Sequence, residues 1–352
     1  MTARGGIDLG GTKIQAVVVD ERDSVVGQSR RPTPSEGGPA AVVAEMAAAV
    51  GEAASEAGVE TGDLAGVGVG SPGDADAAKG TVAQARNVSS EWVEPYPLAA
   101  ELRNALGAPV AIGNDVQVAT GAEFRLGAGK PYGSLLGVFW GTGVGGGLVL
   151  DGRPWTGRGA AGEIGHMVVK RGGARCTCGR RGCVEAYAGR GAMELRARKK
   201  AAKGKKTKLF EIMEERGRER LTSGVWARAL DDGDKLAETL IERAVKALGA
   251  GIASAVNLLD VEAVILGGGL GIRFGETHLG RIEEAMMPHL FVDERPPAVH
   301  VAALGDLGGA IGAALLASGQ KPDHRRKRPA RGAKGGASSR GSGRQARGRA
   351  SR

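Results

Sequence analysis

The chain begins with two short apolar runs that are separated by a glycine-rich turn. Ile7 and Leu9 alternate with small or polar residues, and a run rich in β-branched residues follows at 14–19. Runs of this kind are typical of strands, so we expect a hairpin, with a third antiparallel strand at 24–30. Residues 134–150 repeat the order of strand, glycine turn and strand. This repetition predicts an internally duplicated fold with one glycine hairpin in each half.

Helix and strand patterns alternate along the rest of the chain. Apolar residues at helical spacing predict helices at residues 38–57, 98–106, 116–126, 235–257 and 308–317, with further helices within 189–246 and a solvated lysine-rich turn at 199–208. Short apolar runs predict buried strands at residues 64–69, 109–112, 261–266 and 299–302. This order favours two α/β domains. We expect a small N-terminal domain (residues 1–115) and a C-terminal domain (residues 116–319).

The composition changes this picture only in part. Hydrophobic residues make up 42% of the chain and aromatic residues 3%, and there are 61 glycines, so the core should be aliphatic and rich in tight turns. No apolar run reaches the length of a membrane span, so we expect no membrane segment. No signal-peptide pattern precedes Ile7, and a cytoplasmic protein is therefore expected.

The net charge of +9 is concentrated at the C-terminal end. Residues 320–352 hold twelve Lys or Arg and one acid, so the rest of the chain sums to about −2. This segment is rich in Gly, Ser, Ala and Arg without an aliphatic pattern, which predicts a disordered basic tail. Two interpretations stay open: contact with nucleic acid or another polyanion, or a solubilising extension.

All three cysteines lie in one segment together with a histidine. The order His166-x9-Cys176-x-Cys178-x4-Cys183 offers three thiolates and one imidazole, which is a complete tetrahedral set for structural zinc. An odd number of clustered cysteines indicates a metal in a reducing compartment rather than a disulfide framework. Residues 162–188 are therefore predicted to form a zinc knuckle. The alternative is three free thiols and a surface histidine.

The N-terminal hairpin turn and one later aspartate are candidates for chemistry. The turn exposes the backbone N–H groups, hydroxyl and ammonium of residues 10–13 to an anion such as phosphate. Asp8 precedes the turn and is placed to hold Mg²⁺ through water. Asp115 follows a predicted strand and begins a predicted helix, where open α/β sheets keep their ligands. A plain hairpin turn and an ordinary helix N-cap are the respective alternatives.

These motifs together resemble one known family. They are DLGGTK at 8–13, GND at 113–115, WGTGVGGG at 140–147, GEIGH at 162–166, CTCGRRGCVE at 176–185 and ILGGG at 265–269. Over about residues 4–318 the chain resembles the ROK family (repressor, open reading frame, kinase) and, within it, the bacterial ATP-dependent glucokinases. The resemblance implies an actin-like ATPase (ribonuclease H-like) fold, with two α/β domains around a nucleotide cleft.

The resemblance also implies roles for individual residues. It implies transfer of a phosphoryl group from ATP to D-glucose, giving glucose 6-phosphate as in glycolysis, with Asp115 as general base. An ordinary aspartate pKa would suffice for that step. The implied sugar-binding residues are Asn87, Asn114, Asp115, Glu163, His166 and Glu185. The implied ATP and Mg²⁺ residues are Asp8, Gly10, Gly11, Thr12, Lys13, Gly141, Thr142, Gly143, Gly268 and Gly269.

Several alternatives remain at this stage. The first alternative is another hexose or an N-acetylhexosamine as the acceptor in place of glucose. Such sugars are distinguished by the walls of the pocket, and the motifs do not specify those walls. Polyphosphate can replace ATP as donor, although the family's polyphosphate enzymes generally lack the knuckle. A sugar-sensing regulator that binds nucleic acid through the basic tail is the third alternative. The repressors of the family carry a helix-turn-helix domain before the first strand, whereas only about six residues precede the DLGGTK motif here. The family is commonly dimeric or tetrameric, so a homodimer or homotetramer is expected.

Overall fold

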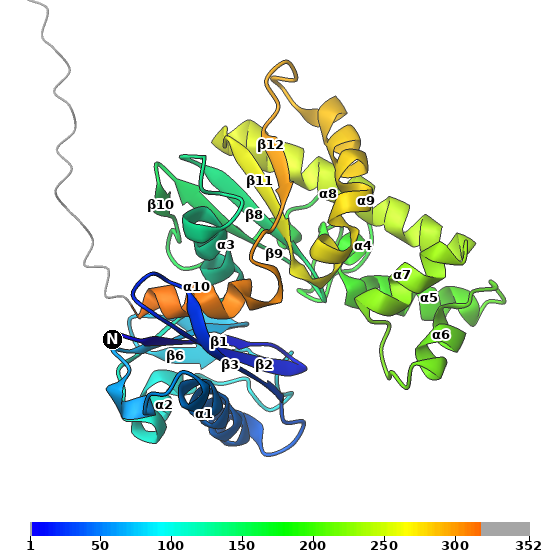
Figure 1. Cartoon of the computed structure of the whole chain (residues 1–352). Coiled ribbons are helices and arrows are strands. Elements are labelled where there is room, and N and C mark those ends of the chain that lie inside the picture. The colour runs from blue at the N-terminus through cyan, green and yellow to red at the C-terminus, as the bar shows by residue number, and fades with distance from the viewer. Residues whose placement is uncertain (1, 318–352) are drawn as a thin grey trace, which may run out of the picture. The chain divides into compact units, whose positions relative to one another are not determined.

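Two five-stranded mixed sheets with the same arrangement form the framework of the protein (Figure 1). The structure is a computed structural model that describes residues 2–317, so the predicted tail at 320–352 lies outside the described residues. In each sheet, three consecutive strands pair antiparallel and two further strands continue in parallel. The repeated topology confirms the internal duplication that the two glycine hairpins predict.

The first sheet has the strand order β3-β2-β1-β4-β7. Its strands are β1 (Arg4–Leu9), β2 (Lys13–Val19), β3 (Val25–Pro32), β4 (Val67–Ser71) and β7 (Val110–Asn114). Helices α1 (Gly38–Glu56) and α2 (Leu98–Leu106) cover one face, and α10 (Gly308–Leu316) covers the other (Figure 1). A small hairpin of β5 (Asp74–Asp76) and β6 (Thr81–Ala83) was not predicted from sequence. Aliphatic side chains such as Ile7, Val42 and Leu98 form the core below this sheet.

The second sheet has the order β10-β9-β8-β11-β12. Its strands are β8 (Leu135–Trp140), β9 (Val144–Leu150), β10 (Arg153–Pro154), β11 (Ala263–Gly267) and β12 (Ala298–Val301). Its helices are α3 (Asp115–Leu126), α4 (Glu185–Ala188), α5 (Arg190–Ala201), α6 (Leu209–Glu215), α7 (Ser223–Asp231), α8 (Lys235–Leu259) and α9 (Gly268–Met286). Short 3-10 turns are η1 (Thr61–Asp63), η2 (Ile164–His166), η3 (Met287–His289) and η4 (Gly305–Leu307). The aliphatic core around α8 includes two fully buried tryptophans, Trp140 and Trp226.

Helix α10 returns from the C-terminal end of the described chain to the first sheet. A Cβ atom on Gly6 of β1 would lie 2.0 Å from the carbonyl oxygen of Ala310, and one on Gly68 of β4 would lie 1.7 Å from that of Ala313. The helix and the two strands therefore meet backbone to backbone, which confirms that the small-residue helix predicted at 308–317 packs closely. The domain boundary predicted at residue 115 separates the two sheets, but α10 contributes to the layer over the first one.

Helix α3 lies between α10 and the second sheet and is anchored at its C-terminal half. The buried carboxylate of Glu123 accepts hydrogen bonds from the N–H groups of Ala128 (3.0 Å), Ala303 (3.0 Å) and Leu304 (2.9 Å). Four residues past Leu304, helix α10 begins. Glu123 therefore fixes the end of α3 to the chain that enters α10.

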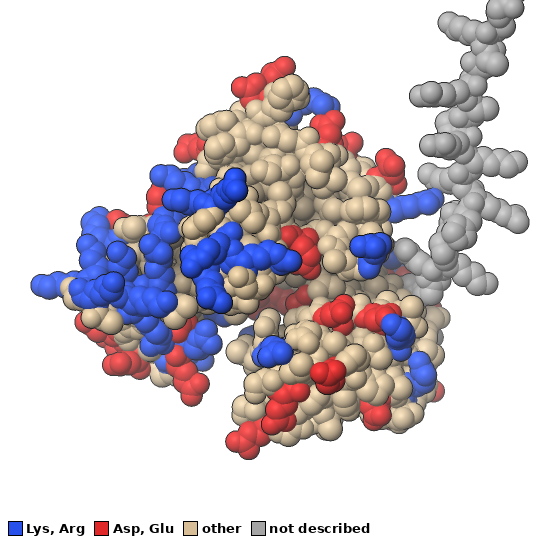
Figure 2. Space-filling view, turned by 180° about the vertical axis from the view of Figure 1, so that it is seen from behind, with Lys and Arg blue, Asp and Glu red and all other residues tan. Residues whose placement is uncertain are grey.

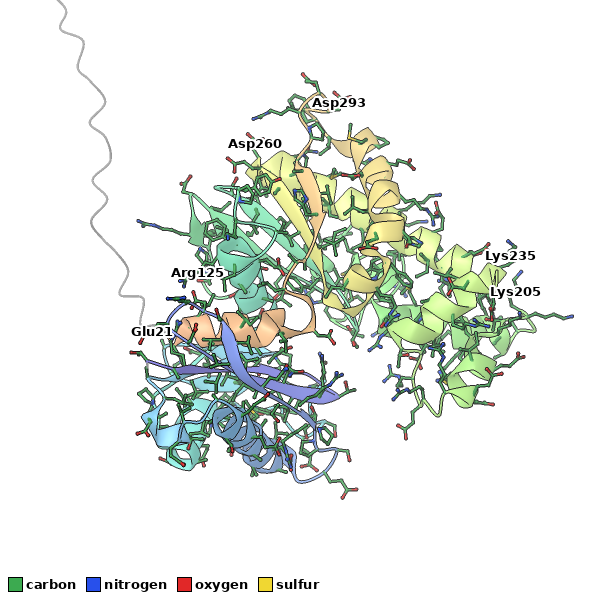
Figure 3. The ribbon with its side chains drawn as sticks, viewed as in Figure 1. Glu21, Arg125, Lys205, Lys235, Asp260 and Asp293 are labelled. Carbon is green, nitrogen blue, oxygen red and sulfur yellow. The ribbon has the colours of Figure 1, made fainter. Side chains whose placement is uncertain are left out.

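The lysine-rich segment at 199–208 connects the end of α5 to α6, as the pattern predicts. Lys203, Lys205 and Lys206 are exposed. Figure 2 shows Lys and Arg side chains gathered over this part of the surface, and in Figure 3 Lys205 projects away from the second sheet. These ammonium groups face solvent, which confirms the prediction of a solvated turn.

Helix α9 is the largest element that sequence reasoning missed. Its 19 residues include four glycines after the first, and glycine has a low helix propensity. The structure explains one of them, because a Cβ atom on Gly275 would lie 2.3 Å from the Cγ2 atom of Val301 in β12. Close packing on the neighbouring strand, rather than intrinsic propensity, accounts for glycine there.

We expect Gly68→Ala to lower the free energy of unfolding by about 2 kcal/mol or more, because its methyl group would overlap the backbone of α10. Urea unfolding followed by circular dichroism measures the change. Gly51→Ala is the matched control. Gly51 lies in α1, and a Cβ atom on it would have no other atom within 4 Å, so alanine there should stabilise by about 0.5–1 kcal/mol. Equal effects of the two substitutions would contradict the backbone contact.

Candidate active site

Strands β1 and β7 bring two aspartates to the same edge of the first sheet. Asp8 of β1 pairs with Gly70 of β4, and Gly70 pairs with Gly113 of β7. A Cβ atom on Gly70 would lie 3.3 Å from the Cα atom of Asp115, the residue that follows β7. Because glycine separates them, the two carboxylate-bearing segments approach closely. This is the edge at which open α/β sheets bind ligands.

Asn114, and not Asp115, is the N-cap of helix α3. The Oδ1 atom of Asn114 accepts hydrogen bonds from the N–H groups of Val116 (3.1 Å) and Gln117 (3.2 Å). Asp115 is the first helical residue, and its Oδ1 atom also accepts from Val116 (2.9 Å). The capping role that local sequence offered for Asp115 is thus filled by its neighbour. The amide of Asn114 keeps its N–H donors for another partner.

Burial and like charge perturb both aspartates. Burial, together with the negative charges of Asp8 and Glu163, raises the pKa of Asp115 to about 7 against the opposing effect of its backbone hydrogen bonds. Burial also raises the pKa of Asp8, an effect that the positive charge of Lys13 opposes and Asp306 reinforces. The sequence required no more than an ordinary aspartate pKa at residue 115. A value near neutrality suits a general base better, because it lies close to working pH.

His166 and the three cysteines converge as the sequence predicts. Their ligand atoms all lie within 4.8 Å of one another. The Sγ atoms of Cys178 and Cys183 are 3.8 Å apart, and Cys176 Sγ is 3.8 Å from His166 Nδ1. A tetrahedral ion with Zn–S bonds of about 2.3 Å holds its sulfur ligands about 3.8 Å apart. The cysteines are free thiols, so the donor set and its spacing fit a four-coordinate structural zinc.

Glycines shape the knuckle around this cluster. Gly179 and Gly182 both have a φ of 87°, which favours glycine. A Cβ atom on Gly182 would also lie 1.8 Å from the carbonyl oxygen of Lys170. The Cys176 N–H donates to the carbonyl of Arg180 (2.8 Å), which closes the turn between the first and last cysteines. The chain can therefore bring three sulfurs together without a long loop.

The ring of His166 faces two ways. Its Nδ1 atom lies on the side of the cysteines, and its Nε2 atom lies 4.0 Å from the Glu163 carboxylate. Glu163 is exposed and precedes η2. The negative charge of Glu163 also acts on Asp115. The two residues of the GEIGH motif thus lie between the knuckle and the aspartate pair.

Glu185 links the knuckle to the turn between β8 and β9. Its Oε1 atom accepts a hydrogen bond from the Thr177 hydroxyl (3.0 Å), and its Oε2 atom accepts one from the Val144 N–H (3.0 Å). A Cβ atom on Gly143 would lie 2.3 Å from Oε2. The predicted sugar-binding glutamate therefore also has a structural task that sequence reasoning did not assign.

The second glycine turn meets the start of α9. Gly268 has a φ of 79°, and a Cβ atom on it would lie 2.7 Å from the Trp140 carbonyl oxygen. A Cβ atom on Gly141 would lie 3.9 Å from the N atom of Gly269. The structure therefore brings together the predicted nucleotide-binding segments 141–143 and 268–269. The first N–H groups of the 19-residue helix α9 lie beside this turn.

The first glycine turn lies against the Asn87 loop. A Cβ atom on Gly11 would lie 2.3 Å from the backbone carbonyl oxygen of Asn87. Asn87 itself is exposed. Thr12 is accessible, and Lys13 forms an ion pair with Asp306 at 3.7 Å. The structure thus places Asn87 beside the predicted phosphate turn. Within residues 2–317, no hydrogen bond or ion pair joins Asn87 to His166 or Glu185.

None of the helices within residues 2–317 combines the length and the apolar character that crossing a membrane requires.

We expect Cys178→Ala to lose bound zinc and activity together, because three ligands hold zinc less tightly than four. Zinc content per chain by plasma mass spectrometry and a thermal melt report the outcome. Thr222→Ala, which removes the helix cap of α7, controls for a general loss of stability. A variant that is metal-free, folded and fully active would contradict the structural role of the metal.

Comparisons with known proteins assign the chain to a family. The family model described as "ROK family" matches residues 4–320. A glucokinase of Halalkalibacterium halodurans is 31% identical over 319 residues, which are 90% of this chain and 95% of that protein. An N-acetylmannosamine kinase of Haemophilus influenzae is 30% identical, with 88% of this chain and 93% of that protein covered.

A solved structure gives the same result for the fold. The ROK family glucokinase of Streptomyces griseus, in complex with glucose and AMPPNP, is 31% identical and superposes with a TM-score of 0.74. The match covers 89% of this chain and 98% of that one. The expected α/β, actin-like ATPase fold is confirmed. The chain belongs to the ROK family.

Proposed function

We propose that the protein is an ATP-dependent glucokinase in which Asp115 is the general base. The observation that carries the proposal is the half-buried Asp115 carboxylate at the end of β7, with a pKa of about 7 and with helix capping supplied by Asn114. A carboxylate with no capping duty and a pKa near neutrality is suited to accept a hydroxyl proton. Glucokinases among the relatives support glucose as acceptor.

The sugar site is proposed to surround this carboxylate. Asn114 retains amide donors, while Glu163 and the Nε2 side of His166 lie nearby. The Oε2 atom of Glu185 has a further lone pair beyond its hydrogen bond to the Val144 N–H. Together these groups provide donors and acceptors for several hydroxyls. A sugar that lacked one of these hydroxyls would leave a polar group unpaired, and such a sugar would bind more weakly.

The donor site is proposed to lie between the two glycine turns. Residues 10–13 offer N–H groups, a hydroxyl and the Lys13 ammonium, and the segment at 141–143 offers a second turn beside the N-terminus of α9. Such groups bind phosphate oxygens without covalent chemistry. AMPPNP, an ATP analogue, occupies the Streptomyces griseus relative, which supports ATP as the donor.

Two metals fit this arrangement in different roles. Asp8 offers a carboxylate next to Lys13 and close to Asp115, which suits Mg²⁺ held through water. Magnesium neutralises phosphate charge when bound, and zinc supplies rigidity to the loop that carries His166. The chain's own residues hold the sugar and receive its proton.

In the proposed reaction, the 6-hydroxyl oxygen of glucose forms a bond to the γ-phosphorus of ATP while the bond to the β,γ-bridging oxygen breaks. Asp115 receives the hydroxyl proton, and ADP leaves with the bonding electron pair. Because the transition state needs mainly positioning and charge neutralisation, the fixed cap at Asn114 matters as much as the basicity of Asp115.

The test is a coupled ADP-release assay with ATP and Mg²⁺. It runs across glucose, mannose, fructose, N-acetylglucosamine and N-acetylmannosamine, with polyphosphate in place of ATP as a parallel arm. Fast turnover of glucose with ATP is the expected result. Turnover confined to an N-acetylhexosamine would replace glucose as substrate and keep the mechanism. No turnover of any sugar by folded, zinc-loaded protein would contradict a kinase and favour a sugar-sensing role.

Asp115→Asn is expected to lower kcat by about 10²-fold or more, because the amide cannot accept the proton. Glucose affinity by calorimetry should stay within a few-fold, since Asn retains a hydrogen-bonding side chain. Because Asp115 can accept a proton only when it is deprotonated, wild-type kcat/KM should rise with pH through about 7. A variant with near wild-type kcat would remove Asp115 as the base.

The raised pKa of Asp115 also has a consequence for stability. Between about pH 4 and pH 7 the folded chain binds this proton more tightly than the unfolded chain, so the contribution of Asp115 to stability falls as pH rises. Asp115→Asn should therefore be on the order of 2 kcal/mol more stable than wild type at pH 8, and not at pH 4. Asp293→Asn, at an exposed position far from the site (Figure 3), is the control. A stability difference that is independent of pH would contradict the burial of this charge.

A further inference from the structure

Arg190 is tied to the second glycine turn by both its backbone and its side chain. Its N–H donates to the carbonyl of Gly141 (3.0 Å), and its guanidinium Nη2 donates to the Thr142 hydroxyl (2.7 Å). The next N–H, from Gly191, donates to the carbonyl of Thr142 (3.0 Å). Helix α5 therefore begins on the turn, and the Arg190 guanidinium lies beside the predicted phosphate-binding backbone.

Arg190 forms no ion pair within residues 2–317, although the negative charge of Glu194 acts on it from a distance. Glu194, one helical turn further on, is buried and already accepts hydrogen bonds from Arg198 (2.8 Å), from Arg220 (3.1 Å) and from the Leu221 N–H (3.1 Å). Arg190 itself is half-buried. Burying a charge without a counterion is costly, so the position favours an anion that arrives with a ligand.

A second guanidinium lies next to Arg190. A Cβ atom on Gly191 would be 4.0 Å from the Nη2 atom of Arg220. The pKa of Arg190 is lowered, first by burial and then by the positive charge of Arg220. The Glu194 carboxylate offsets part of the charge of Arg220, and a multiply charged anion would relieve the repulsion that remains between the two guanidinium groups.

The segment that carries Arg220 also reaches the first glycine turn. Arg218, two residues earlier, lines a pocket together with Thr12, Lys13 and Arg30. Arginines of one short connection between α6 and α7 thus lie beside both turns. This is independent evidence that the two turns border one electropositive space.

We propose that Arg190 binds the phosphates of the donor nucleotide at the turn 141–143, with Arg220 as a second cation. This proposal rests on the proposed function, because it assigns a further residue to the ATP site of that reaction. A guanidinium presents a planar fork of N–H donors that matches phosphate oxygens, and unlike an ammonium it can bind two of them at once. Charge neutralisation of this kind is what phosphoryl transfer requires from its protein groups.

The test compares anion binding by wild type, Arg190→Gln and Arg190→Lys. Arg196→Gln is the matched control, because Arg196 is an exposed arginine on the same helix. ADP binding is measured by calorimetry, and inorganic tripolyphosphate is measured as a competitor that carries charge without adenosine. Arg190→Gln should weaken both by about 10-fold or more. Arg190→Lys should recover part of the loss, and Arg196→Gln should bind as wild type does.

Two further readouts separate phosphate binding from a merely structural role. ADP affinity should fall less steeply with salt in Arg190→Gln than in wild type, because one charge contact is missing. The melting temperature should stay within about 2 °C of wild type, as expected for a substitution away from the packed core. Unchanged ADP and tripolyphosphate affinities in Arg190→Gln would overturn the proposal. So would a loss of ADP affinity with the wild-type salt slope, which would indicate a distorted turn.

The binding data do not depend on turnover. If wild-type protein binds ADP and phosphorylates no sugar, the glucokinase proposal fails while Arg190 is still tested. If glucose is phosphorylated, Arg190→Gln should raise the KM for ATP about 10-fold and leave the KM for glucose within about 2-fold. A rise confined to the KM for glucose would overturn the assignment of Arg190 to the donor site.

Discussion

Helix α10 meets its neighbours backbone to backbone at several points, beside the apolar contacts that its side chains make with Val17 and Val19. Glycines at residues 6 and 68 let the helix rest on two strands, and Gly312 lets it rest on α3, where a Cβ atom would lie 2.5 Å from the Val118 carbonyl oxygen. Gly309 faces the Asp8 carboxylate, and a Cβ atom on it would lie 2.7 Å from the Asp8 Cγ atom. The positions of Asp8 and of the helix that begins at Asp115 therefore depend on one closely packed, small-residue helix. Tight packing of this kind leaves little freedom to adjust.

The charges of the candidate site are segregated. Carboxylates gather at the end of the first sheet, where burial and the charges of neighbouring carboxylates raise the pKa values of Asp8 and Asp115. Cations gather along the glycine turns, where Lys13, Arg190 and Arg218 lie. A sugar hydroxyl needs a proton acceptor, and a triphosphate needs positive charge. The two halves of the proposed reaction thus find opposite environments on neighbouring elements.

Sequence patterns were sufficient where a residue type has one dominant use. The repeated glycine hairpins predicted the duplicated sheets, and the spacing of His166 and the cysteines predicted the cluster that the structure contains. Patterns failed where tertiary packing decides. The strand that was predicted to begin at Leu64 begins at Val67. Leu64 is buried like a strand residue, but it caps the 3-10 turn η1 instead. Helix α9 escaped notice because its glycines serve packing.

In the candidate site, too, some features follow from local sequence and others only from tertiary packing. Local sequence could not tell whether Asn114 or Asp115 caps α3, since both residues favour that position. Arg190 was missed because nothing in its neighbourhood marks it, apart from its place between two glycines at the start of a helix. The link from Glu185 to Val144 joins residues 41 apart in sequence. Only the fold brings such partners within hydrogen-bonding distance.

The hydrogen bonds of Glu185 also connect the knuckle to the second glycine turn. Glu185 joins Thr177, which lies between two thiol ligands, to the N–H group that ends the second glycine turn. One carboxylate therefore holds both the loop of the knuckle and the end of the second glycine turn. A displacement of either segment would be felt by the other, although none of the knuckle's sulfurs lies on that turn.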